Sequence, residues 1–167
     1  MKQKRLIHAC FIFLGVAALL GSALLPLHAG AKMAKPGKID KQKILDYDKE
    51  WKTEYLMYRV DHSFVSTLRA KMGKDMTIDV YLAMWCKDSR INVPKFIKIL
   101  DVARQKEVKV NYYTVERKPD KSMKYYVKDL KVERVPTFIF YRNGKEIGRI
   151  VENPQKNMVE DVLDIIF

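Results

Sequence analysis

The residue best placed for chemistry is Cys86. It follows an apolar stretch, Met76 to Ala83, that is typical of a buried strand, and it precedes a stretch with helical periodicity that begins near Lys87. A sulfur at such a junction lies beside the free backbone amides and the positive dipole end of the helix. These groups stabilise a thiolate and lower the pKa of a cysteine from about 8.5 to between roughly 3.5 and 7.5. The position therefore favours attack on disulfides, for which the thiolate is the nucleophile.

The residues after Cys86 modify this expectation. The charge of Lys87 would stabilise a thiolate and that of Asp88 would oppose it, so their combined effect stays open. Ser89 lies within one helical turn, where its hydroxyl is placed to donate a hydrogen bond to the sulfur, but it cannot attack a mixed disulfide as a second thiol would. An isolated cysteine can also be a small buried hydrophobe without chemistry.

Alternating helix and strand patterns position this junction. Asp61 is expected to cap a helix with a buried face, and Met76 to Ala83 then forms a strand in which Ile78, Val80 and Leu82 share one side. The next expected elements are a helix from about Lys87 to Gln105, a strand from Val108 to Val115, a helix from about Ser122 to Lys131 and a strand from Val135 to Tyr141.

The C-terminal pattern adds a hairpin and a helix. Asn143-Gly144 is a two-residue turn signal, so Lys145 to Val151 is expected to pair antiparallel with the preceding strand. Asn153 is expected to cap the closing helix, with Pro154 at its first position. The inward face of that helix is predicted to hold Met158, Val159, Val162, Leu163 and Ile166. The whole order predicts an α/β fold with a central mixed sheet of about four strands and flanking helices.

Two segments resemble a known family. Trp85 to Pro94, WCKDSRINVP, is similar to the active-site segment of thioredoxins, and Val135 to Gly148, VPTFIFYRNGKEIG, is similar to the thioredoxin stretch that begins with the cis-proline. The resemblance covers roughly residues 61–167 and implies a thioredoxin-like fold. The Trp-Cys-x-Asp-Ser form also resembles a bacterial subgroup in which a single thiol or Cys-x-Asp-Cys replaces the commoner active-site motif.

The resemblance implies roles for individual residues. Cys86 takes the attacking position and Ser89 stands where the second cysteine would be, while Trp85 forms part of the rim around the sulfur. Pro136 is implied to be cis, and the backbone at Val135 is implied to face Cys86 and to pair with an extended peptide substrate.

Two positions depart from the family pattern. Ser89 removes the resolving thiol, and Val80 stands where many thioredoxins carry a buried carboxylate that moves protons. Asp79 is the nearest acid, but strand alternation turns it to the opposite face. A dithiol-to-disulfide cycle within one chain is therefore excluded.

The N-terminus has the order of a secretory signal. Lys2, Lys4 and Arg5 precede an uncharged apolar stretch from Ala9 to Leu27, and small residues follow at Ala29-Gly30-Ala31. We interpret residues 1–31 as a signal peptide, 32–60 as a basic leader and N-terminal arm, and 61–167 as the thioredoxin-like domain. This predicts an extracytoplasmic, periplasmic protein. The alternative is an uncleaved anchor, which would bring membrane contact.

Composition excludes several classes of function. The formal charge is +12, and loss of residues 1–31 with their three cations and no acids would leave +9. The cations are interspersed with acids and no recognition motif is present, so we expect no nucleic-acid partner. The mature segment keeps one histidine, His62, and one cysteine, Cys86, which is too few for a His/Cys metal site or an internal disulfide. We expect no cofactor.

Three hypotheses for function remain. In the first, Cys86 forms a mixed disulfide with a protein or small-thiol disulfide and an external thiol reductant resolves it, which gives reductase-like or isomerase-like activity. In the second, the domain is a non-catalytic peptide-binding or chaperone-like module. In the third, Cys86 links two copies of the chain as a homodimer.

Overall fold

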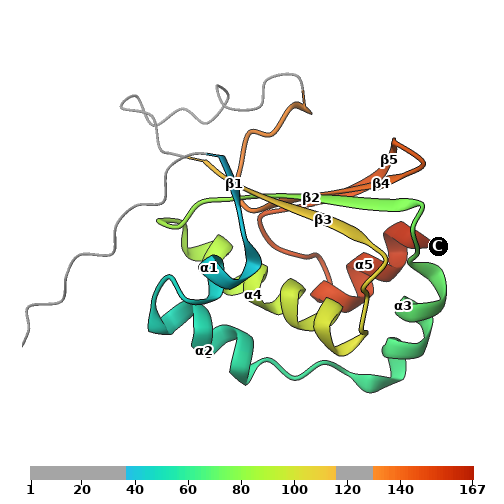
Figure 1. The fold of residues 1–167 in the computed structure, drawn as a ribbon, viewed down its shortest axis with the longest axis horizontal. Coiled ribbons are helices and arrows are strands. Elements are labelled where there is room, and N and C mark those ends of the chain that lie inside the picture. Colours follow the sequence, from blue (N-terminus) through green and yellow to red (C-terminus); the bar gives the residue numbers. More distant parts are fainter. Residues whose placement is uncertain (1–36, 116–129) are drawn as a thin grey trace, which may run out of the picture. The chain divides into compact units, whose positions relative to one another are not determined.

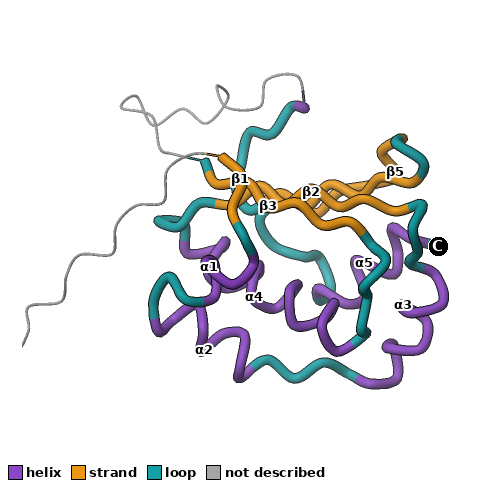
Figure 2. The backbone as a smooth tube through the Cα atoms, viewed as in Figure 1, coloured by secondary structure: helices purple, strands orange, loops and turns teal. Residues whose placement is uncertain are grey.

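The computed structural model describes residues 37–115 and 130–167, and in these ranges the chain forms one five-stranded mixed sheet with helices packed against it (Figures 1 and 2). The strands are β1 (Gly37–Ile39), β2 (Met76–Leu82), β3 (Lys109–Thr114), β4 (Thr137–Arg142) and β5 (Lys145–Val151), in the spatial order β1-β3-β2-β4-β5. Strands β2 and β3 are parallel, and the other neighbouring pairs are antiparallel. The predicted α/β class is confirmed, with one more strand than expected.

The helices of the described ranges lie on one side of the sheet (Figure 1). They are α1 (Lys41–Leu45), α2 (Lys49–Met57), a 3-10 helix η1 (His62–Phe64), α3 (Val65–Lys71), α4 (Lys87–Val102) and α5 (Met158–Ile166). None of these described helices is long and apolar enough to cross a membrane.

Strand alternation divides β2 between two apolar clusters. Ile78, Val80 and Leu82 belong to the large cluster on the helix side, whereas Tyr81 and Ala83 belong to a smaller cluster on the other side. Both clusters fix the path of the chain as it leaves the sheet. The strand therefore delivers the next residues, including Cys86, to a defined point.

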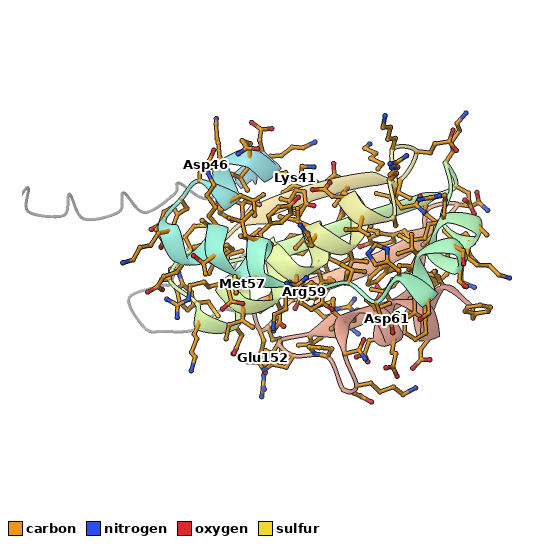
Figure 3. The ribbon with its side chains drawn as sticks, turned by 90° about the horizontal axis from the view of Figure 1, so that it is seen from below. Lys41, Asp46, Met57, Arg59, Asp61 and Glu152 are labelled. Atoms are coloured by element: carbon orange, nitrogen blue, oxygen red, sulfur yellow. The ribbon has the colours of Figure 1, made fainter. Side chains whose placement is uncertain are left out.

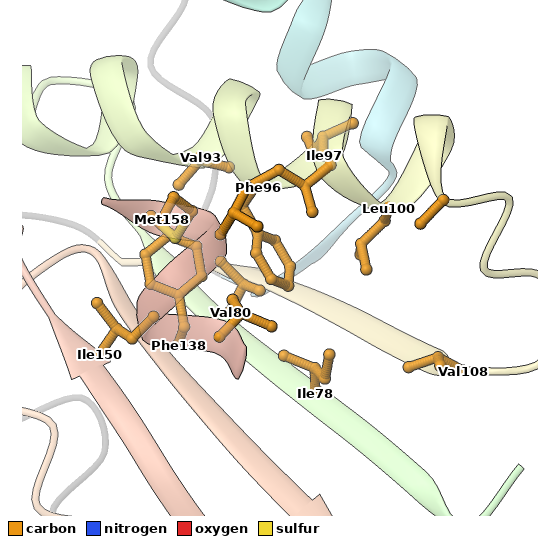
Figure 4. Close-up of a cluster of buried hydrophobic side chains, with 14 of the residues drawn as sticks. Ile78, Val80, Val93, Phe96, Ile97, Leu100, Val108, Phe138, Ile150 and Met158 are labelled. Carbon is orange, nitrogen blue, oxygen red and sulfur yellow. The ribbon is translucent and has the colours of Figure 1, made fainter. Parts of the chain in front are cut away.

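The large cluster also seats α4 firmly on the sheet (Figure 4). Its apolar face recurs at helical spacing, and Phe96 packs with ring centroids 5.0 Å from Phe138 of β4. Val93, Ile97 and Leu100 complete this face as the sequence predicts. Because α4 is held along its length, the side chains of its first turn have little freedom to shift.

The N-terminal arm contributes to the same core. Ile44 of α1 and Trp51 of α2 are fully buried in the large cluster, and α2 runs beside α4 when seen from the helix side (Figure 3). Residues 37–43, which lie in the segment interpreted as a basic leader and arm, form defined elements of the fold, because β1 pairs with β3 and α1 begins at Lys41. The partner that orders this segment lies more than seventy residues away, in the register Gly37 to Thr114.

The C-terminal hairpin and helix test two further predictions. The turn at Asn143 and Gly144 has φ values of 51° and 79°, which confirms the hairpin. The start predicted for the closing helix is wrong: α5 is capped by Asn157, whose side chain accepts hydrogen bonds from the amides of Val159 and Glu160. Asn153 instead accepts a hydrogen bond from the side chain of Asn92 at 2.8 Å.

Some predictions fall outside the described residues. These are the signal peptide, the leader before residue 37, and residues 122–129 of the helix expected from Ser122 to Lys131. The last two residues of that helix are described, and Lys131 lies in a turn with φ of 50°.

Candidate functional site

Cys86 occupies the N-cap position of α4. Its backbone is extended, with φ −90° and ψ 125°, and its carbonyl accepts the first helical hydrogen bond from the amide of Arg90 at 3.0 Å. The side chain makes no capping hydrogen bond. Instead the Sγ donates to the carbonyl oxygen of Val135 at 3.2 Å, and the half-buried thiol is free of any disulfide. The sulfur is thus directed across to the β4 side of the site.

The segment opposite the sulfur is fixed by its own contacts. The Val135–Pro136 peptide bond is cis, and both residues are buried. The hydroxyl of Thr137 donates to the carbonyl of Arg134 at 2.7 Å, and the amide of Glu152 donates to the carbonyl of Pro136 at 2.7 Å. These bonds leave the Val135 carbonyl directed at Cys86.

Ser89 has a different role from the one the sequence suggests. It is fully buried, and its Oγ accepts a hydrogen bond from the amide of Ala83 at 3.2 Å. No hydrogen bond between the Ser89 hydroxyl and the Cys86 sulfur is present among the described contacts. The hydroxyl therefore ties the end of β2 to the first turn of α4 and fixes the loop that carries the cysteine.

The position on β2 where thioredoxins carry a buried acid is apolar here. Val80 is fully buried on the helix side, as predicted. Asp79 points to the other face, where it accepts a hydrogen bond from the side chain of Asn111 at 2.7 Å. Burial, followed by the charge of Asp79, raises the pKa of the neighbouring Tyr81. The acid thus belongs to a tyrosine-lined region of the sheet and not to the α4 side.

Beside the sulfur lies a pocket of about 280 Å³. Trp85 and Cys86 line it from the loop before α4, and Trp51 lines it from α2. The remaining lining residues are Asp48, Met84, Lys87 and Arg90. Trp85 is half-buried beside the sulfur and also packs against the smaller apolar cluster. Trp85 thus lies where the resemblance implied a rim residue, and its role in binding stays a prediction.

Trp51 lines the site although no sequence motif marks it as a site residue. Its indole is fully buried, and the Nε1 atom has no hydrogen-bond partner among the described residues. The local sequence does indicate a helix start here, with an aspartate cap just before an aromatic residue. The Asp48 carboxylate accepts hydrogen bonds from the amides of Glu50 and Trp51. Nothing local indicates that this helix reaches the cysteine, because the packing of α2 on α4 is a long-range contact.

Charges around the site are partly paired. The guanidinium of Arg90 donates to the carboxylate of Glu50, and that of Arg134 donates to Glu152 at 2.7 Å. The ammonium of Lys87 has no ion-pair or hydrogen-bond partner among the described residues. No group of three or more His, Cys, Asp or Glu side chains in the described ranges is arranged to hold a metal ion. The chemistry that the arrangement offers is that of a thiol.

Known proteins share the fold of this chain, and a family profile matches most of its sequence. A family profile described as thioredoxin matches residues 38–163, and no curated protein matches the chain significantly. Among solved structures, a Pseudomonas aeruginosa protein of unknown function is 13% identical, with a TM-score of 0.56 over 78% of this chain and 90% of that one.

Two thioredoxins of known structure are also similar. That of Fasciola hepatica is 20% identical, with a TM-score of 0.40 over 60% of this chain and 86% of its own. That of Malassezia sympodialis is 23% identical, with a TM-score of 0.40 over 59% and 83% of the two chains. Because the family profile spans most of the sequence, including Cys86 and the Val135-Pro136 segment, the chain belongs to the thioredoxin family.

Proposed function

We propose that this protein carries out thiol–disulfide exchange with one cysteine, Cys86, on protein or small-thiol disulfides. The observation that carries the proposal is the 3.2 Å contact from the Cys86 Sγ to the Val135 carbonyl, which places the thiol against the cis-Pro136 segment. An extended peptide that pairs with the backbone at Val135 would hold its own disulfide beside that sulfur.

The exchange proceeds in two steps. The Cys86 thiol loses its proton to solvent, and the thiolate attacks one sulfur of the substrate disulfide, forming a new S–S bond and releasing the other sulfur as a thiolate. Because Ser89 offers a hydroxyl in place of a thiol, an outside thiol or the substrate's own second cysteine then breaks the mixed disulfide. An outside thiol is itself oxidised and supplies the electrons for reductase-like activity, whereas attack by the substrate's own cysteine rearranges its disulfides with no net transfer of electrons, which is isomerase-like activity.

The test is mass spectrometry of the reduced domain after incubation with a peptide disulfide. We expect a one-to-one peptide adduct on Cys86 that persists until an external thiol is added. The Cys86→Ser variant should form none. A wild-type chain that stays unmodified under conditions where free cysteine reacts would contradict the proposal.

The second candidate is a peptide-binding module that does not depend on the sulfur. The buried Val80 favours it, because the proton-moving acid of the family pattern is missing from that position. Retention of the peptide by Cys86→Ser, measured by fluorescence anisotropy of a labelled peptide, would support this candidate. Loss of retention in that variant favours covalent exchange.

The sequence pattern also suggests a compartment and an oligomeric state for the protein. We propose an extracytoplasmic, periplasmic site of action, with the N-terminal 31 residues as the signal. N-terminal sequencing of the protein from its native compartment tests the cleavage, and a start at residue 1 would identify an anchor instead. A Cys86-linked homodimer would run at twice the monomer mass on non-reducing electrophoresis and would be inactive until reduced.

A further inference from the structure

Cys86 takes part in two different environments in the structure. In one, the sulfur touches the Val135 carbonyl. The other environment is the 280 Å³ pocket, whose lining comes from α2, the loop before α4 and the first turn of α4. Arg134, Val135 and Pro136 do not line it. A substrate held against the cis-proline segment would therefore leave this pocket open.

Thiol–disulfide exchange needs room on both sides of the central sulfur. The attacking, central and leaving sulfurs lie nearly in line in the transition state, so a thiol that displaces a substrate from Cys86 must enter from the side away from that substrate. With the substrate at Val135, we take the pocket as this entry side, because Cys86 lines it and Val135 does not. Its volume of about 280 Å³ is just below the range of about 300–1,000 Å³ that is usual for ligand sites, which suits a molecule of about the size of an amino acid.

The pocket lining favours an anionic molecule. Lys87 contributes an ammonium without a partner among the described residues, and Arg90 contributes a guanidinium already bound to Glu50. The Oδ1 atom of the Asp48 carboxylate accepts hydrogen bonds from two backbone amides at the start of α2. The fully buried indole N–H of Trp51 lacks an acceptor among the described residues. The lining thus carries two cations and one carboxylate, and Lys87 is the cation left to pair with an anionic ligand.

We propose that this pocket binds the resolving thiol itself, a small thiol that carries a carboxylate, with the carboxylate at Lys87 and the sulfur at Cys86. The proposal rests on the proposed exchange function. The small thiolate attacks the Cys86 sulfur of the mixed disulfide, forms a disulfide with it and releases the substrate as a thiolate. A second small thiol then attacks the bound small thiol, which frees Cys86 and leaves a small-molecule disulfide.

The test measures how three small thiols release a peptide from its mixed disulfide with Cys86. The probes are 3-mercaptopropionate, 2-mercaptoethanol and cysteamine, which are anionic, neutral and cationic. Each second-order rate constant is first corrected for the fraction of the probe that is thiolate at the pH used. It is then divided by the rate constant with which the same probe releases the same peptide from a mixed disulfide with free cysteine. We expect the anionic thiol to exceed the neutral one by about twofold to fivefold, as one exposed charge pair allows, and the cationic one to be slowest.

The charge of Lys87 is the element to vary. Lys87→Glu should reverse the order of the anionic and cationic thiols, while Lys145→Glu, at an exposed hairpin position, should leave it unchanged. The ratio between probes is unaffected by any change in the reactivity of Cys86, because the same mixed disulfide serves for all three. A ratio equal to that on free cysteine, or one that Lys87→Glu leaves unchanged, overturns the pocket assignment alone. Failure of the mixed disulfide to form would overturn the proposed function as well.

Discussion

The two long helices that follow strands begin in opposite ways. At α5, the Asn157 side chain accepts hydrogen bonds from the amides of Val159 and Glu160, the usual way to satisfy a helix N-terminus. At α4, Cys86 holds the same N-cap position, but its side chain makes no capping bond and its sulfur turns to Val135. A residue well suited to stabilise the helix is thus replaced, at one of the two junctions, by one suited to react.

The difference shows where stability and chemistry separate in this domain. A Ser, Asn or Asp cap contributes about 0.5–2 kcal/mol relative to alanine, and α2 obtains such a cap from Asp48. The start of α4 forgoes it and is held instead by the Ser89 contact to Ala83 and by the apolar face that packs on the sheet. Local departures from favourable structure concentrate at functional sites.

Replacing Cys86 by serine should change activity more than any other substitution, and it would also give α4 a conventional cap. Cys86→Ser should abolish formation of the peptide adduct, because no sulfur remains to attack. The same variant should be more stable than Cys86→Ala by about 1 kcal/mol, since only serine can accept a hydrogen bond from the amides of the first turn. Urea unfolding of both variants measures the difference. Equal stabilities would mean that the α4 N-terminus is already satisfied without a cap.

A second change restores a thiol within the first turn of α4. Ser89→Cys places a sulfur where thioredoxins have their second cysteine, so it should resolve the mixed disulfide internally. The peptide adduct should then fall at least about tenfold in yield, since an intramolecular thiol competes with high effective concentration. Mass spectrometry should show instead an oxidised chain with a disulfide between Cys86 and the introduced thiol. Persistence of the adduct would show that the geometry of this turn prevents a dithiol cycle.

The conventional junction should respond only in stability. Asn157→Ala removes the acceptor for two amides at the start of α5, and we expect a loss of about 1 kcal/mol. Its rate of adduct formation should equal that of the wild-type chain. Thermal and urea unfolding test the first expectation. A slower reaction with the peptide disulfide would link α5 to the site and weaken the contrast between the two junctions.

The smallest change in stability is expected at Asp61, a helix cap whose carboxyl group titrates. The backbone amide of Ser63 donates to the Asp61 carboxylate and lowers its pKa, so this cap stabilises the fold at pH values above the usual aspartate pKa. The contribution is lost as the pH falls through the lowered pKa. Asparagine cannot titrate, so Asp61→Asn should unfold at the same urea concentration as the wild type at pH 6. Near pH 2.5 the variant should unfold at a slightly higher urea concentration than the wild type. Identical curves at both pH values would exclude a role for the charge.

The elements with local signals were predicted well, and those set by distant contacts were not. The turn at Asn143-Gly144 and the alternation of β2 follow from a few neighbouring residues. Strand β1 was missed because three residues, Gly37–Ile39, become a strand only by pairing with β3. The start of α5 was misplaced by one turn, since Asn153 and Asn157 both suit a cap and the contact to Asn92 engages the first of them.

The same distinction between local signals and distant contacts holds for the site residues. Cys86, Ser89 and Val135 are recognisable from their motifs, but the partner of each side chain is not. The Ser89 hydroxyl was expected at the sulfur and is bonded to the amide of Ala83, because the turn from Ala83 to Cys86 brings that amide to the first turn of α4. The pocket beside Trp51 could not be predicted, since it exists only where α2 packs against α4.

The most direct test of the central claim compares Cys86 in the folded chain with the same cysteine in the unfolded chain. The measurement is the second-order rate constant for attack on a peptide disulfide, at one pH, with and without urea and with a cysteine peptide to correct for the effect of urea. We predict that the folded chain reacts at least about tenfold faster, because the Val135–Pro136 segment holds the disulfide at the sulfur. A folded chain that reacts at the same rate or more slowly would contradict it.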